Sequence, residues 1–209
     1  MSAVKLTELA RTFCLSILKL FYLNMLWLLF TMLGLVIFGL APATAALCQV
    51  QHHWLKEKHV SSTFRLFWKE YKQHFMKTNG LMIILISIGY IIYFDLQFFM
   101  DKEGLWNRLI SIGIFILSIW YMIIILYIFP VYTYYEVKLF KYIQYAFIVG
   151  LLNPFRTIGV AFTVGGMVYL SLYFPQIMFS LGVSLTFFIL MIMANQAMNQ
   201  VAVKKERYS

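Results

Sequence analysis

Long apolar stretches separated by short polar ones dominate the chain. Runs of about 20 apolar residues are long enough to cross ~30 Å of hydrocarbon as helices. The second run is shorter than the others and would rise only about 21 Å as a helix. The pattern predicts an all-α polytopic membrane bundle. Its six helices are expected at about 19–38, 42–55, 80–99, 109–127, 158–174 and 176–194.

Composition and charge strengthen this prediction and bear on how many times the chain crosses. Hydrophobic residues make up 62% of the chain and charged residues 12%, where a soluble domain carries about 25% charged residues. With six crossings, 15 of the 17 Lys and Arg residues fall on one side; with five crossings and a re-entrant segment, 12 do. The positive-inside rule therefore favours six crossings with both termini in the cytoplasm. Five spans with a re-entrant second segment is the alternative.

Small residues and prolines predict where the helices turn and pack. Gly39 suits the end of the first helix and Pro42 the first turn of the second. The small residues that follow, with Thr44 among them, permit close helix contact. Pro130, near the end of the fourth span, predicts a kink or a helix end.

A basic, aromatic segment over about 62–77 predicts an additional amphipathic helix on the cytoplasmic side. Ser61 or Ser62 provides an N-cap, and aromatic residues then recur at spacings of three and four, which places them on one face. Such a helix lies in the membrane interface, or it docks against a helix of another protein. The candidate partner-binding residues are Phe64, Phe67, Trp68, Tyr71 and Phe75.

Few residues within the spans can carry chemistry. Asn24 and Asp95 are the polar intramembrane candidates, and such residues are often functional. Asp95 lies near the outer end of its span, where it can reach water or Arg108. The four histidines lack the spacing of a zinc site, and no ATP-binding or nucleophile motif is present, so we expect no metal, no cofactor, no direct ATP binding and no enzymatic activity.

The net charge of +9 follows from the cytoplasmic loops. It indicates membrane topology and contact with anionic lipids rather than nucleic-acid binding. We expect one integral membrane domain over 1–209, embedded in a cell membrane.

Three short motifs carry a family resemblance. They are Tyr22-Leu23-Asn24-x-Leu26-Trp27, then Gly34-Leu35-x-x-Phe38-Gly39-x-x-Pro42-Ala43-Thr44-Ala45-Ala46, and then Trp54, Phe67-Trp68 and Phe75. With them, nearly the whole chain resembles the YesL-like family of bacterial membrane proteins. The resemblance implies five or six spans, and genes that accompany importers of plant-polysaccharide oligosaccharides.

The expected function rests on this resemblance. It implies an accessory membrane subunit of an ABC-type carbohydrate importer, which binds the permease subunits and stabilises or regulates them. The alternative is a small autonomous transporter or channel, with Asn24, Thr44, Gln49 and Asp95 along a polar path. A membrane enzyme that uses His52 or His53 is a third possibility.

Overall fold

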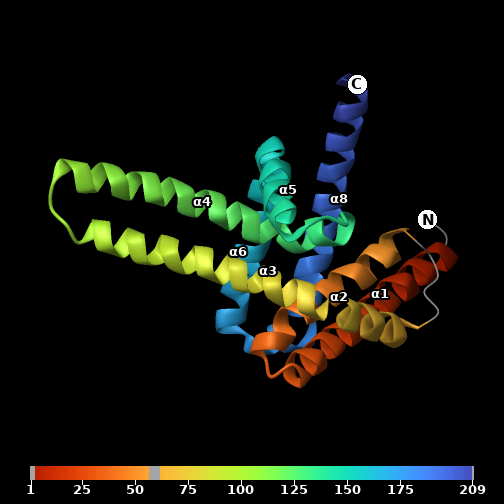
Figure 1. Cartoon of the computed structure of the whole chain (residues 1–209). Coiled ribbons are helices and arrows are strands. Elements are labelled where there is room, and N and C mark those ends of the chain that lie inside the picture. The colour runs from red at the N-terminus through yellow and green to blue at the C-terminus, as the bar shows by residue number, and fades with distance from the viewer. Residues whose placement is uncertain (1–2, 57–61, 209) are drawn as a thin grey trace. The chain divides into compact units, whose positions relative to one another are not determined.

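All the secondary structure described is helical (Figure 1), which confirms the all-α polytopic class. The computed structural model of the chain describes residues 3–56 and 62–208. Five of the helical segments in these ranges are long and apolar enough to cross a membrane. The elements are α1 Ala3–Leu33, α2 Ile37–Lys56, α3 Thr63–Met100, α4 Leu105–Tyr134, α5 Leu139–Leu152, α6 Pro154–Tyr173, α7 Pro175–Ile177, the π-helix η1 Met178–Gly182 and α8 Val183–Tyr208.

The helices form two compact units, and α3, α6 and α8 run through both. The first unit comprises residues 1–73 and 162–191, and the second comprises residues 74–161 and 192–209. Each unit is therefore assembled from segments far apart in the sequence. That both belong to one membrane domain stays a prediction.

In the first unit, α1 and α2 lie side by side and antiparallel (Figure 1). The turn between them occupies residues 34–36, so the prediction of a break over Gly39–Pro42 was wrong. Leu35 has φ 55° and Val36 has φ 64°, a left-handed conformation that costs energy in residues with side chains, most of all in a β-branched one. Apolar residues at such a turn give no sequence signal, which explains the misplacement.

Because the turn comes early, Gly39 and Pro42 both lie inside α2. A side chain at Gly39 would collide with the Thr31 carbonyl oxygen of α1, so the glycine lets the two helices approach closely. Pro42 is in the second turn of α2, near enough to the helix start for the loss of one hydrogen bond to be tolerated. The Thr44 hydroxyl accepts a hydrogen bond from Trp27 Nε1 at 3.0 Å. The expected packing role of this segment therefore fits the structure, and the expected turn does not.

The predicted amphipathic helix and the span that follows it are one continuous helix, α3. Ser62 provides the N-cap, since its side chain accepts a hydrogen bond from Arg65 N; Ser61 and His59 lie outside the described residues. At the expected boundary, Thr78 Oγ1 and Asn79 Nδ2 donate to the carbonyl oxygens of His74 and Phe75. These residues commonly start a new element, but here their side chains bond back to the helix, which continues.

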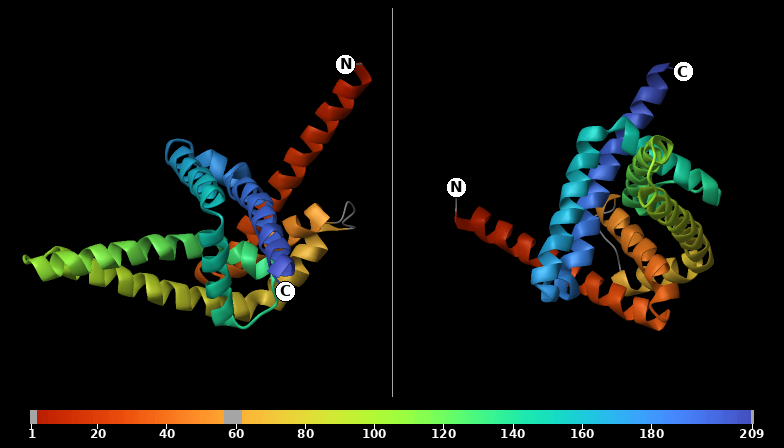
Figure 2. Two further views of the ribbon diagram at one scale, coloured as in Figure 1. Left: turned by 90° about the horizontal axis from the view of Figure 1, so that it is seen from above. Right: turned by 90° about the vertical axis from the view of Figure 1, so that its left-hand side faces the viewer.

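The rest of the first unit is formed by the hairpin of α6 and α8. These helices run side by side (Figure 2), and α7 and η1 join them. The π-helix η1 packs against α1. In a π-helix the backbone hydrogen bonds join residues five apart instead of four. This stretch therefore depends on hydrogen-bond partners outside the helix.

In the second unit, α3 and α4 form a long antiparallel hairpin (Figure 1). Tyr121 of α4 donates a hydrogen bond to the Leu85 carbonyl oxygen of α3 at 2.8 Å. The outer faces of the hairpin are apolar and exposed, as expected of helices surrounded by lipid. Pro130 is buried inside α4, which continues to Tyr134; the helix therefore does not end at this proline.

The structure has five candidate membrane spans in its described ranges, whereas the sequence favoured six, and the difference is at α2. With 20 residues, α2 is not among the five helices that are apolar enough to cross. Tyr71 donates to the Phe30 carbonyl oxygen, and a Cβ at Gly34 would lie 2.8 Å from the Tyr71 hydroxyl. Six spans would put residues 34 and 71 on opposite sides of the membrane, whereas here they are in contact. This contact favours the re-entrant alternative.

Candidate functional site

The first three turns of α3 are anchored on α1 by an aromatic cluster. Phe30 of α1 is 1% exposed, and its ring centroid lies 5.0 Å from those of both Phe67 and Tyr71. Phe67 is fully buried and Tyr71 is 7% exposed. These two predicted partner-binding residues therefore pack within this protein, and another protein cannot reach them in this structure.

The side of the same turns that adjoins this cluster remains exposed. Phe64 is 48% and Trp68 is 39% exposed, and both rings still touch the edge of the Phe30 cluster. The Lys72 ammonium lies 4.3 Å from the centroid of the Trp68 ring, a cation–π contact that orients both side chains. We call the exposed set the basic-aromatic surface; it consists of Phe64, Arg65, Trp68, Lys69 and Lys72.

The remaining predicted site residues lie elsewhere. Phe75 is half-buried on the part of α3 that belongs to the second unit, as is Asp95. In the described part of the chain, Asp95 forms no ion pair with Arg108. Asn24 and Thr44 belong to the first unit.

Asn24 lies in a buried polar network that supports the π-helix. Its Nδ2 group donates to the carbonyl oxygens of Met178 at 3.2 Å and Phe179 at 2.7 Å, and its Oδ1 accepts from Ser184 N at 3.0 Å. From the other side, Gln51 Nε2 donates to the Ser184 carbonyl oxygen at 2.7 Å. The Asn24 amide thus donates two hydrogen bonds and accepts one at η1, where the backbone hydrogen bonds depart from the α-helical pattern.

The other members of this network could not be found from sequence. Gln51 and Ser184 are fully buried, and 133 positions separate them along the chain. Buried polar residues in apolar helices were the one available signal. The polar path predicted for a transporter includes the neighbouring Gln49 and not Gln51.

A second polar cluster, rich in tyrosine, lies in the second unit. The Tyr132 hydroxyl is 2.8 Å from His74 Nδ1, and Lys77 Nζ donates to the Tyr142 hydroxyl at 3.0 Å. The two tyrosine rings are in contact, with centroids 4.9 Å apart. Nearby, partial burial and then the Tyr145 phenol raise the pKa of Tyr135. The cluster ties α3, α4 and α5 together, and the Tyr132–Tyr135 run was its sequence signal.

Neither cluster resembles a metal centre. In the ranges that the structure describes, no three His, Cys, Asp or Glu side chains come together in a way that could hold an ion. The buried side chains Asn24, Gln51 and Ser184 all bond to backbone atoms. Their arrangement can hold helices in register, and the basic-aromatic surface can bind a complementary surface.

Comparison with known proteins identifies the family. Residues 20–96 match the family model described as "Protein of unknown function, DUF624". The protein YesV of Bacillus subtilis strain 168 is 33% identical over 162 residues, which cover 78% of each chain. The chain belongs to the YesL-like DUF624 family.

Two further members from the same organism show how far the similarity extends. YesL is 29% identical over 93% of this chain and 92% of its own. YteU is 32% identical over 83% of this chain and 78% of its own. All three relatives are named as uncharacterised proteins, and no solved structure matches significantly. The segment matched by the DUF624 model contains Asn24, α2 and the basic-aromatic surface.

Proposed function

We propose that this protein is a non-enzymatic accessory membrane protein that binds the permease subunits of an ABC-type oligosaccharide importer. It acts in the bacterial cytoplasmic membrane, with the basic-aromatic surface and the C-terminus on the cytoplasmic side. The family resemblance suggests the partner, and the basic-aromatic surface is the observation that carries the binding role.

The division of the α3 start into a buried and an exposed face supports binding. Because Phe67 and Tyr71 are packed on Phe30, the exposed face is held in place before any partner arrives. Preorganisation of this kind lowers the entropy cost of association. A loosely attached interfacial helix would not offer this advantage.

The chemistry of the exposed face supports a protein partner. Aromatic and Arg side chains are enriched among the residues that dominate binding energy at protein interfaces. Phe64 and Trp68 supply apolar area, while Arg65, Lys69 and Lys72 surround them with positive charge. The complementary partner surface is an apolar groove with an acidic rim, formed by cytoplasmic loops or helices of a permease.

Site-specific photocrosslinking tests this proposal in the living host. A benzophenone amino acid replaces Trp68 in one variant. In a matched control it replaces Trp106 of α4, a tryptophan that is 77% exposed. We expect position 68 to crosslink to permease subunits during growth on the oligosaccharide, and position 106 not to do so.

Uptake provides a second readout for the same surface. The double variant Phe64→Ala/Trp68→Ala is expected to lower oligosaccharide uptake while the amount of protein in the membrane stays normal. Crosslinks from position 68 to lipid alone, with normal uptake in the double variant, would instead show that the surface faces headgroups. That result would reject the accessory role.

A further inference from the structure

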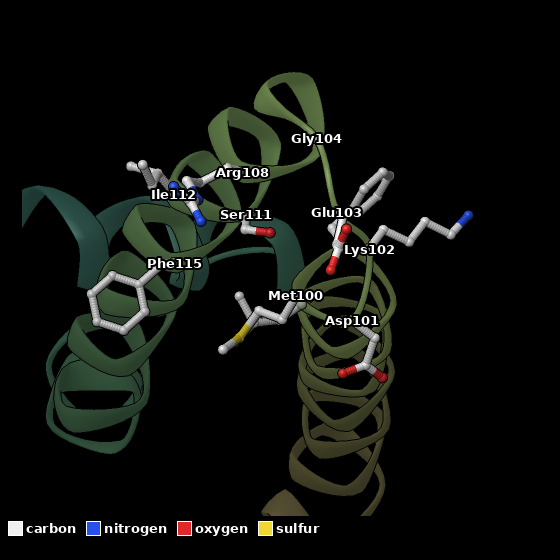
Figure 3. Close-up of a pocket in the computed structure, with 11 residues that line it drawn as sticks. Met100, Asp101, Lys102, Glu103, Gly104, Arg108, Ser111, Ile112 and Phe115 are labelled. Carbon is white, nitrogen blue, oxygen red and sulfur yellow. The ribbon is translucent and has the colours of Figure 1, made fainter.

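A cavity of about 790 Å³ opens where the α3–α4 hairpin turns (Figure 3). Arg108, Ser111 and Phe115 project from α4, Met100 comes from the end of α3, and Glu103 belongs to the connecting loop. The two sides of the cavity differ in character. Toward the loop the lining is charged, and along the helices it is apolar, with Leu96, Phe99, Ile112 and Phe115.

The charges at the rim have both signs and are not used within the protein. Asp101 and Glu103 lie close to Arg108 in sequence, yet none of the three forms an ion pair in the described part of the chain. Lys102, by contrast, extends away from α4 and places its ammonium 3.7 Å from the centroid of the Phe98 ring. Within the described ranges, the rim therefore presents the Arg108 cation and the two carboxylates without an ion-pair partner.

The sequence around the cavity is typical of a membrane–water interface. Both helices that form it are long and apolar enough to span a bilayer, and the loop 101–104 carries the only charges between them. Trp106, at 77% exposure, follows the loop by two residues, and Tyr93, at 59%, precedes it by eight. Tryptophan and tyrosine in such positions are typical of the headgroup region.

We infer that this cavity binds a phospholipid with a zwitterionic, amine-bearing headgroup, of the phosphatidylethanolamine class. Arg108 binds the phosphate, because a guanidinium donates two parallel hydrogen bonds to phosphate oxygens. Glu103 and Asp101 accept hydrogen bonds from the ammonium group. The start of an acyl chain lies along Ile112 and Phe115, where the apolar lining continues onto the lipid-facing side of α4.

The charge pattern favours this class of lipid over an anionic one. A phosphatidylglycerol headgroup would offer a phosphate to Arg108 and neutral hydroxyl donors to the two carboxylates, but it has no cation to offset the repulsion between those carboxylates and its net negative charge. An ammonium group near the carboxylates turns this repulsion into attraction. The volume, larger than a headgroup needs, leaves room for part of an acyl chain between the helices.

Native mass spectrometry of the full chain tests the inference. The protein is purified in detergent, incubated with mixed micelles that contain equal amounts of phosphatidylethanolamine and phosphatidylglycerol, and the bound lipids are counted. We expect the wild type to retain phosphatidylethanolamine preferentially. Arg108→Gln should lower retention of both lipids about tenfold or more, since charge-assisted hydrogen bonds are lost; Arg108→Lys should restore part of it.

The carboxylates are tested by their effect on headgroup choice. Asp101→Asn/Glu103→Gln should remove the preference for phosphatidylethanolamine while phosphatidylglycerol binding is unchanged or improved. Controls with the same charge changes at exposed positions elsewhere, Arg11→Gln and Glu8→Gln/Glu136→Gln, should bind lipid as the wild type does.

Three outcomes would overturn the inference. The first is equal lipid retention by Arg108→Gln and Arg11→Gln. The second is a phosphatidylethanolamine preference that survives Asp101→Asn/Glu103→Gln. The third is equally strong binding of glycerophosphoethanolamine, which has the headgroup without acyl chains. This last result would show that the apolar walls contribute nothing.

Discussion

Replacement of Asn24 by leucine tests the role of the polar network in the first unit. Leucine has the branched shape of asparagine and is somewhat larger, but it has no hydrogen-bonding group, so the variant removes the amide without opening a cavity. The two carbonyl oxygens of η1 and the Ser184 amide would lose their bonds to Asn24. We expect the variant to be destabilised and η1 to be the first segment to loosen.

The magnitude follows from the number of bonds. Hydrogen bonds between membrane helices contribute about 0.6 kcal/mol each on average and about 1.7 at most, so three of them predict a loss of roughly 2–5 kcal/mol. The upper half of this range applies if the Ser184 amide finds no other acceptor, because an unsatisfied buried group costs about 1–3 kcal/mol by itself.

The free energy of unfolding can be measured by titration with sodium dodecyl sulfate in mixed micelles, followed by circular dichroism. Asn107→Leu is the matched control, since Asn107 makes one local hydrogen bond, to the Glu103 carbonyl oxygen. It should lose less than about 1 kcal/mol. If Asn24→Leu unfolds at the same detergent fraction as Asn107→Leu, the network does not stabilise the π-helix and this reasoning is refuted.

Three further substitutions, two of them with a matched control variant, test the packing of α1 against α2 and α3 in the same assay. Phe67→Ala should cost about 3–5 kcal/mol because it empties a buried site, whereas Trp68→Ala should cost about 1 or less; equal losses would contradict the assignment of buried and exposed faces. Gly39→Ala should destabilise by roughly 1–3 kcal/mol through overpacking, while Gly113→Ala, with open space around it, should gain about 0.5–1 from helix propensity. Val36→Gly should stabilise the protein by about 1 kcal/mol by relieving the left-handed conformation, and a clear loss would show that the turn is formed differently.

The all-α class and most of the spans could be predicted because they depend on properties local in sequence. The apolar runs near 80–99 and 109–127 lie within α3 and α4. Length and hydropathy alone are enough to predict such membrane helices. A serine N-cap at position 61 or 62 could likewise be predicted, because a cap depends on the residues of one turn.

The features that were missed depend on tertiary contacts. The aromatic stripe of 62–77 was visible, but whether Phe67 faces lipid, a partner or Phe30 cannot be read from its own segment. The turn at Leu35 and Val36 consists of residues that ordinarily avoid such a conformation. Asn24 was singled out as a polar residue within an apolar span, but its hydrogen-bond partners lie in a π-helix more than 150 positions away.

The measurement that tests the central claim most directly is the native purification of the tagged protein from its own host, grown on the imported oligosaccharide. Companions are quantified by mass spectrometry for the wild type, for Phe64→Ala/Trp68→Ala and for Trp106→Ala. The account predicts near-equal amounts of permease subunits with the wild type and Trp106→Ala, and their loss from the double variant. Recovery of the folded wild-type protein without permease subunits, or with equal amounts in all three preparations, would contradict it.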